Sequence, residues 1–338
     1  MNLSEPRYSK YALVKEMMDT ISVIKKFNPD QTKNVAEKIK SVGKLLLTGE
    51  GSSRIFPAKN TIRKALTRGL DLCIITDGSR LAAQYDLSKF AVFCASNSGR
   101  TKEVILLAKK LAAINNNNRF AVTANSGTLL EKECVETFVL QCGWEEATAA
   151  TKSVVEQALV YESLLWNITG LDRKNDLADL SGKIENVLTM SVDPAVVSFA
   201  AEAPTIYFAG YNDGVTEELT LKTNEITRKK SDFLEGTYAV HGIEEVMEKK
   251  DIVFVVDPID EEIDKFQEVL EKGVGLKVVA IAAKETPFTT IRVPDAGDLN
   301  PYLFLCAGWN ILVEIGLALG VNPDKPQRAR KVGNELAG

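Results

Sequence analysis

The 338-residue sequence contains a single histidine, His241. Imidazole acid–base chemistry near neutral pH would therefore depend on this residue, because no other side chain has an unperturbed pKa in that range. Cysteine is scarce as well: the five cysteines form no Cys-x-x-Cys motif and no cluster with histidine, which argues against a zinc site. We expect free thiols, as in a reducing compartment such as the cytoplasm, and no metal.

Long hydrophobic runs and an excess of one charge are also absent. The first twenty residues are charged throughout, unlike a signal peptide. The longest apolar stretch, 301–320, contains Asn310 and Glu314, which favours a buried core helix over a membrane span. The 41 basic and 46 acidic residues are interspersed and give a net charge of −5. We therefore predict a cytoplasmic protein that binds neither nucleic acid nor membranes.

Short apolar runs alternate with segments of helical periodicity, as in the βαβ units of a parallel sheet. The length favours two domains, and the two halves look like one architecture used twice. The predicted strands are 44–48, 72–76, 91–95, 120–123, 137–141, 205–209, 251–256, 277–281 and 290–293. The predicted helices are 56–67, 102–113, 151–167, a linking helix 181–203, 217–229, 261–272 and 301–320.

Small hydroxyl residues and glycines follow two of these strands. Gly49-Glu-Gly-Ser-Ser53 comes after the first strand, and Ser96-Asn-Ser-Gly-Arg-Thr101 comes after the third. Each loop leads into a helix, whose N-terminus presents free N–H groups that can bind an anion. Neither loop has a Walker A or Gly-x-Gly-x-x-Gly pattern, so nucleotide binding is not supported. Serine and threonine also cap helices without any ligand, but two such loops favour a phosphate or carboxylate site.

The two loops resemble the phosphosugar loops of SIS (sugar isomerase) domains, the second of which reads Ser-x-Ser-Gly-x-Thr. The second half resembles the isomerase part of glucosamine-6-phosphate synthase and the related double-SIS deaminases and deglycases. In that family one helix carries Glu-x-x-x-Lys-x-x-Glu, a pattern kept by Glu218, Lys222 and Glu225. A His-Gly pair follows sixteen residues after the second glutamate, as His241 does here. The resemblance covers almost the whole chain.

The resemblance implies an α/β fold with two tandem SIS-type three-layer α/β/α domains, each with a parallel sheet, and a C-terminal tail. The expected parts are an N-terminal helical segment 1–35, a first SIS domain 36–170, a linker helix 171–195, a second SIS domain 196–322 and a tail 323–338 that contributes to the active site. It also implies a homodimer with shared active sites, in which the histidine reaches the partner subunit, and no cofactor.

The resemblance assigns roles to individual residues. Glu225 is the base that moves a proton between C1 and C2, His241 is the acid–base group for ring opening, and Lys331 is the amine that engages the carbonyl, with Arg330 as the alternative tail residue. The expected phosphate- and substrate-binding residues are Gly51, Ser52, Ser53, Ser96, Asn97, Ser98, Thr101, Thr151, Glu218 and Lys222. The spacing of the helix triad puts its side chains on one face, which is also typical of an exposed ion-pair stripe.

Three functions remain open at this point. The first is isomerisation or deamination of a 6-phosphorylated amino sugar such as glucosamine 6-phosphate. The second is a deglycase that splits a fructosamine 6-phosphate into glucose 6-phosphate and an amine. The third is a non-catalytic sugar-phosphate sensor, which would be expected to lack the glutamate, histidine or lysine found here. Tyr238, Ile243 and Arg100 differ from the usual family residues, and this leaves the substrate undecided.

Overall fold

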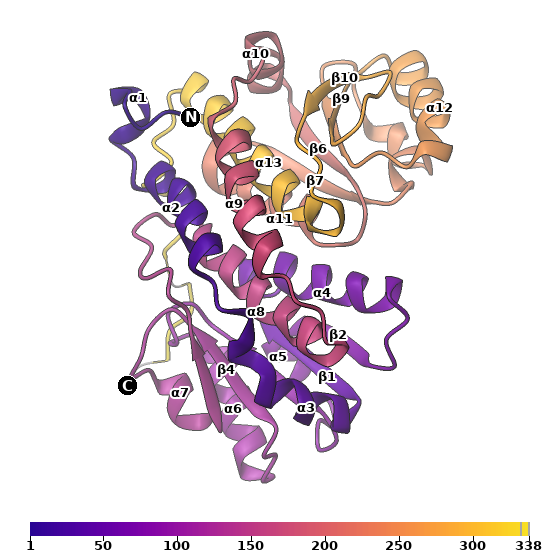
Figure 1. Ribbon diagram of the computed structural model, residues 1–338. Coiled ribbons are helices and arrows are strands. Elements are labelled where there is room, and N and C mark those ends of the chain that lie inside the picture. The colour runs from indigo at the N-terminus through magenta and orange to yellow at the C-terminus, as the bar shows by residue number, and fades with distance from the viewer. Residues whose placement is uncertain (332, 337–338) are drawn as a thin grey trace. The chain divides into compact units, whose positions relative to one another are not determined.

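A computed structural model describes residues 1–331 and 333–336 of the protein, which form two compact units (Figure 1). The β1–β5 unit comprises residues 19–146, 150–179 and the tail from Arg328. The β6–β10 unit comprises residues 1–18, 147–149 and 180–327. Two helices, α2 (Ala12–Lys26) and α9 (Lys174–Thr189), have residues in both units.

The β1–β5 unit is built on a five-stranded parallel sheet in the order β2-β1-β3-β4-β5. Its strands are β1 (Lys44–Gly49), β2 (Cys73–Gly78), β3 (Ala91–Ala95), β4 (Arg119–Thr123) and β5 (Glu136–Val139). Its helices are α3 (Lys33–Val42), α4 (Ile55–Thr67), α5 (Ser79–Ala82), α6 (Lys102–Ala113), α7 (Leu129–Glu133) and α8 (Lys152–Thr169). From β1 the chain adds β2 on one side and then crosses over to add β3 on the other, and ligands of open α/β sheets bind at such a switch point between neighbouring strands.

The β6–β10 unit repeats this topology with the order β10-β9-β8-β6-β7, again with all strands parallel. Its strands are β6 (Thr205–Gly210), β7 (Lys230–Glu235), β8 (Ile252–Val256), β9 (Lys277–Ala282) and β10 (Thr289–Arg292). Its helices are α1 (Pro6–Ser9), α10 (Pro194–Glu202), α11 (Val215–Thr227), α12 (Ile263–Phe266), the π-helical segment Gln267–Val274 and α13 (Asn300–Ala318). The corresponding switch point lies between β6 and β8.

Helices cover both faces of the β1–β5 sheet and make it the middle layer of three. On one face, Phe93 and Phe120 pack with Ile39 of α3 and Tyr161 of α8. On the other face, Val92, Cys94 and Ala121 pack with α5, α6 and α7 through residues such as Leu111 and Leu130. Because both faces are buried, the central strands are nearly continuous apolar runs. The predicted α/β class with two parallel sheets is confirmed.

The structure differs from the sequence prediction at one strand and one helix. The strand β7 is not apparent from the sequence, because Lys230–Glu235 (KSDFLE) has two apolar residues among four polar ones; it lies at the edge of its sheet, next to β6. The predicted linking helix 181–203 is wrong: the chain forms α9 and α10, separated at Pro194. Proline cannot donate a hydrogen bond inside a helix but fits its first turn. Asp193 caps α10 by accepting a hydrogen bond from the Ala195 N–H at 2.8 Å.

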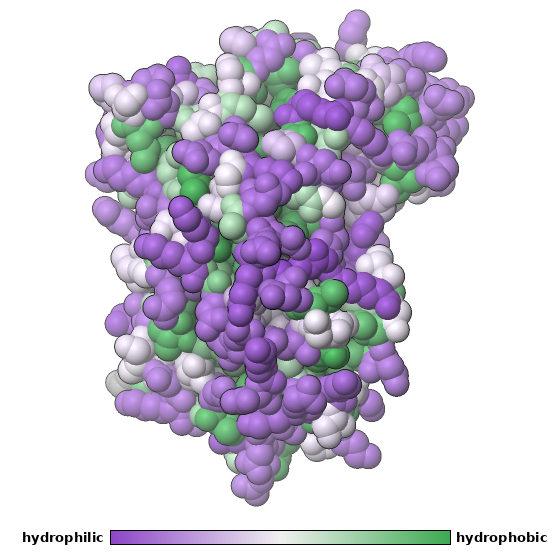
Figure 2. All heavy atoms as spheres, in the orientation of Figure 1, coloured by the Kyte–Doolittle hydropathy of each residue, from purple (hydrophilic) through white to green (hydrophobic). Residues whose placement is uncertain are grey.

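The longest apolar helix lies in the core of its unit. Residues 297–318 are long and apolar enough to cross a membrane, but 78% of the most apolar window is buried within the protein. Gly308 lets α13 approach α11 closely, because a Cβ atom there would lie 2.3 Å from the Leu219 side chain. On the face shown in Figure 2, hydrophilic residues predominate and hydrophobic ones form small separate groups. The helix α13 is therefore a core helix, as the sequence predicted.

Candidate active site

The loop after β3 gathers three hydroxyl groups at the N-terminus of α6. The Ser96 Oγ atom is buried and lies 2.8 Å from Thr101 Oγ1 and 3.5 Å from Ser98 Oγ. Thr101 occupies the N-cap position of the twelve-residue helix without capping it through its side chain. The hydroxyls and the positive helix end therefore face the same small region, which suits an anion.

Gly99 shapes this loop because no other residue fits there. Its φ angle is +64°, and an added Cβ atom would lie 2.4 Å from the Thr128 side chain. The Gly99 carbonyl also accepts a hydrogen bond from the Leu130 N–H at 3.3 Å. Residues at the start of α7 thus contact this loop and hold it in place.

The loop after β1 lies beside the loop after β3. A Cβ atom on Gly49 would lie 2.9 Å from the Ala95 carbonyl oxygen, so the two strand ends approach closely at the switch point. Gly51, Ser52 and Ser53 form one turn of 3-10 helix and are not fully buried. The Ser53 carbonyl accepts a hydrogen bond from Gln157 Nε2 at 2.5 Å, which anchors this turn to α8.

A buried carboxylate, Glu145, organises the third side of the site. It accepts hydrogen bonds from the Thr151 N–H at 2.7 Å, from Ser153 Oγ at 2.5 Å and from Asn97 Nδ2 at 3.0 Å. It therefore occupies the N-terminus of α8 and fixes the turn that contains Thr151. The sequence does not single out Glu145, because Glu145 and Glu146 stand together in a loop and no spacing distinguishes the buried one.

The side-chain amide oxygen of Asn97 is a further candidate for contact with a ligand. Its Oδ1 atom is buried and accepts no hydrogen bond within the part of the chain that the structure describes. Buried acceptors without a partner are uncommon, and a bound ligand is one explanation for them. Asn97 is therefore placed to receive a donor group of a ligand in the same loop as the hydroxyls.

The C-terminal tail pairs with the loop after β3. Thr101 and Glu335 form an antiparallel bridge, the Lys102 N–H donates to the Asn334 carbonyl at 3.0 Å, and the Leu336 N–H donates to the Arg100 carbonyl at 3.0 Å. Earlier in the tail, the Lys331 Nζ atom lies 5.9 Å from the centre of the Trp144 ring. A cavity of about 750 Å³ adjoins this region and is lined by Ser98, Arg100, Asn125, Thr128, Trp144 and Leu336, among others.

In the β6–β10 unit, α11 carries a buried ion-pair triad. Lys222 Nζ lies 3.1 Å from Glu218 Oε1 and 2.7 Å from Glu225 Oε2. The side chains of Lys222 and Glu218 are fully buried, whereas that of Glu225 is 25% exposed. Burial acts to lower the pKa of Lys222, but the attraction of Glu225 and Glu218 outweighs it and raises the pKa above its ordinary value. Lys222 is therefore a permanent cation, and Glu225 is the member of the triad that solvent can reach.

His241 lies on a different element of the same unit. It ends the 3-10 helix Tyr238–Val240, is exposed, and donates its backbone N–H to the Tyr238 carbonyl at 3.1 Å. Within the described residues, no hydrogen bond or ion pair joins it to the triad of α11. The predicted site residues thus form two groups: the hydroxyl loops, Thr151 and Lys331 in the β1–β5 unit, and the triad and His241 in the β6–β10 unit.

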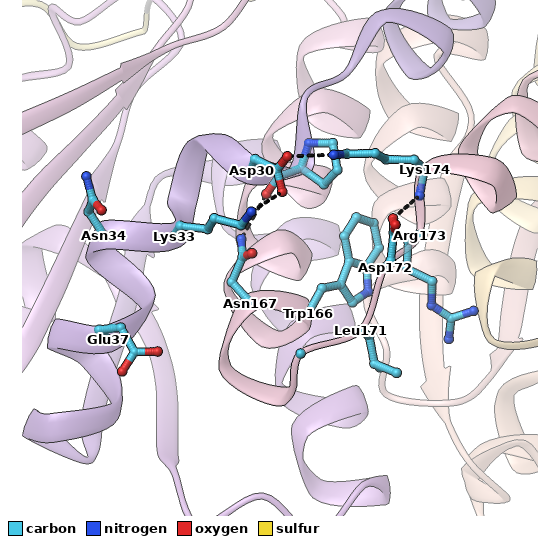
Figure 3. Close-up of a pocket in the computed structure, with 12 residues that line it drawn as sticks. Asp30, Lys33, Asn34, Glu37, Trp166, Asn167, Leu171, Asp172, Arg173 and Lys174 are labelled. Carbon is cyan, nitrogen blue, oxygen red and sulfur yellow. Dashed lines mark hydrogen bonds and ion pairs between the residues drawn. The ribbon is translucent and has the colours of Figure 1, made fainter.

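A second cavity, of about 460 Å³, lies away from the strand ends of the β1–β5 unit (Figure 3). Its charges largely neutralise one another: Asp30 pairs with Lys33 at 2.9 Å and with Lys174 at 2.6 Å. These contacts lower the pKa of the Asp30 carboxyl. Because these lysines are paired with a carboxylate, the cavity is less suited to a phosphate than the hydroxyl groups at the helix N-terminus beside Ser96.

Comparison with solved structures identifies the fold. The C-terminal domain of glucosamine-fructose-6-phosphate aminotransferase from Francisella tularensis matches with a TM-score of 0.77 and 17% identity, over 94% of this chain and 98% of that one. Glucosamine-6-phosphate deaminase from Thermotoga maritima matches with a TM-score of 0.72 and 24% identity, over 95% and 99%. Tagatose-6-phosphate ketose/aldose isomerase from Escherichia coli matches with a TM-score of 0.72 and 15% identity, over 93% and 96%.

No family model matches the sequence, and no curated protein sequence matches it. The structural matches, at 24% identity or less, establish the fold: two SIS-type domains in tandem, shared with phosphosugar enzymes. This is the fold that the sequence motifs predicted.

Proposed function

We propose that the protein is a phosphosugar isomerase or deaminase that acts on a 6-phosphorylated amino sugar. The observation that carries this proposal is the cluster of Ser96, Ser98 and Thr101 hydroxyls at the N-terminus of α6, beside the switch point of a sheet whose fold is that of phosphosugar enzymes. Hydroxyl donors and a helix N-terminus suit a dianionic phosphate. The hydroxyls of Ser52 and Ser53, with the Gly51 backbone, complete the proposed phosphate site.

Glu225 is the proposed general base. In a deaminase it takes the proton from C2 of open-chain glucosamine 6-phosphate and returns a proton to C1, and water then hydrolyses the resulting C2 imine to fructose 6-phosphate and ammonia. The ion pair to Lys222 holds the Glu225 carboxylate in place, and the partial exposure of Glu225 leaves it accessible to a substrate. Lys222 and Glu218, being buried, act as positioning residues.

His241 and Lys331 have separate proposed tasks. His241 transfers the ring-oxygen proton during ring opening, and Lys331 engages the carbonyl of the open-chain sugar or stabilises negative charge on its oxygen. Asn97 and Thr151, both tied to Glu145, bind sugar hydroxyls. The proposed chemistry needs no metal or organic cofactor.

A fructosamine-6-phosphate deglycase is the second candidate, and the cavity beside Arg100 and Trp144 favours it. The same base would take a proton from C1, return one to C2, and leave an aldehyde imine that water splits into glucose 6-phosphate and an amine. A volume of about 750 Å³ leaves room for more than a hexose phosphate. The Arg100 guanidinium and the half-exposed Trp144 ring would suit a carboxylate-bearing substituent on the nitrogen.

We also propose a cytoplasmic homodimer in which His241 completes the partner's site. His241 lies in an exposed segment whose neighbours include two exposed apolar side chains, Tyr238 at 49% and Val246 at 67%. A second subunit would cover them. Mixing inactive Glu225→Gln and His241→Ala homodimers tests the sharing: partial recovery of activity supports it, and no recovery after verified subunit exchange contradicts it.

The decisive test of the function is an assay against a panel of 6-phosphosugars and fructosamine 6-phosphates, with detection of ammonia, free amino acid and hexose 6-phosphate. Ammonia from glucosamine 6-phosphate supports the deaminase. Amino acid and glucose 6-phosphate from a fructosamine adduct support the deglycase. Binding of phosphosugars without turnover of any of them would contradict both.

A further inference from the structure

The Glu50 carboxylate joins the loop after β1 to the end of β2. Its Oε1 atom accepts a hydrogen bond from the Ser79 N–H at 2.9 Å. Gly78, the last residue of β2, lies directly beside it: a Cβ atom there would lie 3.4 Å from Glu50 Oε2 and 3.6 Å from Glu50 Oε1. The side chain of Glu50 is therefore held by the end of the neighbouring strand.

The strand ends next to this contact are themselves fixed. β1 and β2 pair along their full length, so Glu50 is the first residue beyond the paired strands. The buried Thr48 Oγ1 atom donates to the Asp77 carbonyl at 2.7 Å and lies 3.1 Å from Ser79 Oγ. Ser79 thus offers its N–H group to Glu50 from a buried, hydrogen-bonded position.

The backbone of Glu50 begins the turn Gly51–Ser53, which belongs to the proposed phosphate site. The Glu50 carbonyl accepts a hydrogen bond from the Ser53 N–H at 3.3 Å, and the Arg54 N–H donates to the Gly51 carbonyl at 3.0 Å. At the other end of the turn, Gln157 Nε2 donates to the Ser53 carbonyl at 2.5 Å. The turn is therefore fixed at its start through Glu50 and at its end through Gln157.

The topology of the sheet does not require a carboxylate at this position. In the β6–β10 unit, β6 ends in a glycine as β1 does, and the next residue is Tyr211. A carboxylate beside a phosphate site repels the ligand unless other groups offset its charge. Burial raises the pKa of Glu50, and the N–H groups of Ser79 and Arg80 oppose this by stabilising its anion. The contact with the end of β2 thus offsets part of the charge that would oppose a phosphate.

We propose that Glu50 is a positioning residue for phosphosugar binding, which fixes the turn Gly51–Ser53 to the end of β2 through the Ser79 N–H. Its effect on binding rests on the proposed function of the turn, whereas its effect on the conformation of the turn does not. An acceptor oxygen is sufficient for the contact, so glutamine should replace glutamate. Alanine should not, because it leaves the Ser79 N–H without this acceptor and releases the start of the turn.

The test compares Glu50→Ala and Glu50→Gln with the wild-type protein. Titration calorimetry should show that Glu50→Ala binds glucose 6-phosphate about tenfold more weakly, as expected for the loss of one hydrogen bond to a charged group. Glu50→Gln should bind as tightly as the wild type or more tightly. In the ligand-free protein, hydrogen–deuterium exchange at the Ser53 and Arg54 amides should be faster only in Glu50→Ala.

Asp86→Ala is the matched control. Asp86 is another exposed carboxylate of the same unit, and it accepts a hydrogen bond from the Ser88 backbone N–H at 3.1 Å. Urea denaturation should show similar losses of stability for the two alanine variants, because each removes one acceptor of a backbone N–H. Only Glu50→Ala should also weaken the binding of glucose 6-phosphate.

Two results would overturn the inference. One is a Glu50→Ala variant that binds glucose 6-phosphate as tightly as the wild type. The other is a Glu50→Gln variant that loses as much affinity as Glu50→Ala, because the carboxylate would then act through its charge and not as an acceptor. Failure of the proposed function is a different result: the wild-type protein would then not bind glucose 6-phosphate at all, while amide exchange would still show whether Glu50 fixes the turn.

Discussion

The two units share one topology but differ at their switch points. In each unit the first strand, β1 or β6, ends in a glycine that leaves no room for a side chain. A Cβ atom on Gly49 would lie 2.9 Å from the Ala95 carbonyl oxygen, and one on Gly210 would lie 2.7 Å from the Val256 carbonyl oxygen. After β3 the chain supplies serines and a threonine. After β8 it supplies Asp257, a proline, an isoleucine and then the acidic turn Asp260–Glu262.

These loops give the two switch points opposite chemistry. At the switch point after β8, the carboxylates would repel a phosphate. The cavity there is only about 10 Å³ and is lined by Val256, Ile259 and Phe266, among others. The switch point after β3 presents hydroxyl groups, a helix N-terminus and a large neighbouring cavity. The fold thus provides the same strand ends twice, while a few loop residues make the end of β3 better suited to an anion than the end of β8.

The helix after the first strand also differs between the units. In α4, the buried Lys64 pairs with Glu162 of another helix, α8. In α11, Lys222 pairs with Glu218 and Glu225 of its own helix, and the second glutamate is left partly exposed. A structural ion pair in one unit thus corresponds to a triad with an accessible carboxylate in the other.

The largest effect is expected from Glu225→Gln. Removing a general base should lower kcat by about 10²–10⁴-fold. Affinity for the phosphosugar should stay nearly unchanged, because the proposed phosphate contacts come from other residues. Steady-state kinetics together with calorimetric titration measures both quantities, and equal loss of turnover and affinity would rule out the role of base.

Lys222→Met should mainly affect stability. It leaves the fully buried Glu218 carboxylate without its cation, and breaking such a pair costs about 3–5 kcal/mol in the free energy of unfolding. Lys64→Met is the matched control, since it breaks the buried pair with Glu162 at a similar cost. Urea denaturation measures both. Only Lys222→Met should also lower kcat, because only its partner Glu225 is proposed to act on substrate.

Gly99→Ala should weaken phosphosugar binding by about tenfold or more, since a shift of the loop that costs 1.4 kcal/mol is a factor of ten. The new methyl group would collide with Thr128 at a φ angle of +64°. Gly127→Ala is the matched control: Gly127 has a φ angle of +70°, but among the described residues no heavy atom beyond its own chain neighbours lies within 4 Å of its Cβ position. Titration calorimetry should show a clear loss only for Gly99→Ala, and equal losses would show that backbone strain rather than the collision matters.

Arg100→Ala should have the smallest effect, and a selective one. The Arg100 side chain is 68% exposed, so its charge is worth about 1 kcal/mol or less. If the substrate carries an amino-acid carboxylate in the cavity, KM for fructosamine 6-phosphates should rise by a few fold while that for glucosamine 6-phosphate stays the same. An equal rise for both would place Arg100 at the phosphate instead.

The sequence predicted those features that depend on short stretches of chain. The loops at Gly49–Ser53 and Ser96–Thr101 and the spacing of Glu218, Lys222 and Glu225 are local patterns with a direct chemical meaning. Features built by distant segments could not be predicted in this way. The burial of Glu145 depends on contacts from Asn97 and Ser153, and the pairing of Thr101 with Glu335 joins residues far apart in sequence.

The central claim is that a 6-phosphosugar binds at the β3 switch point and not at its counterpart after β8. Hydrogen–deuterium exchange with and without saturating glucose 6-phosphate tests it directly. The account predicts slower exchange of amides in the segments 51–53 and 96–102, and no change in 257–262. Protection of 257–262, or no protection of 96–102 under saturating ligand, would contradict it.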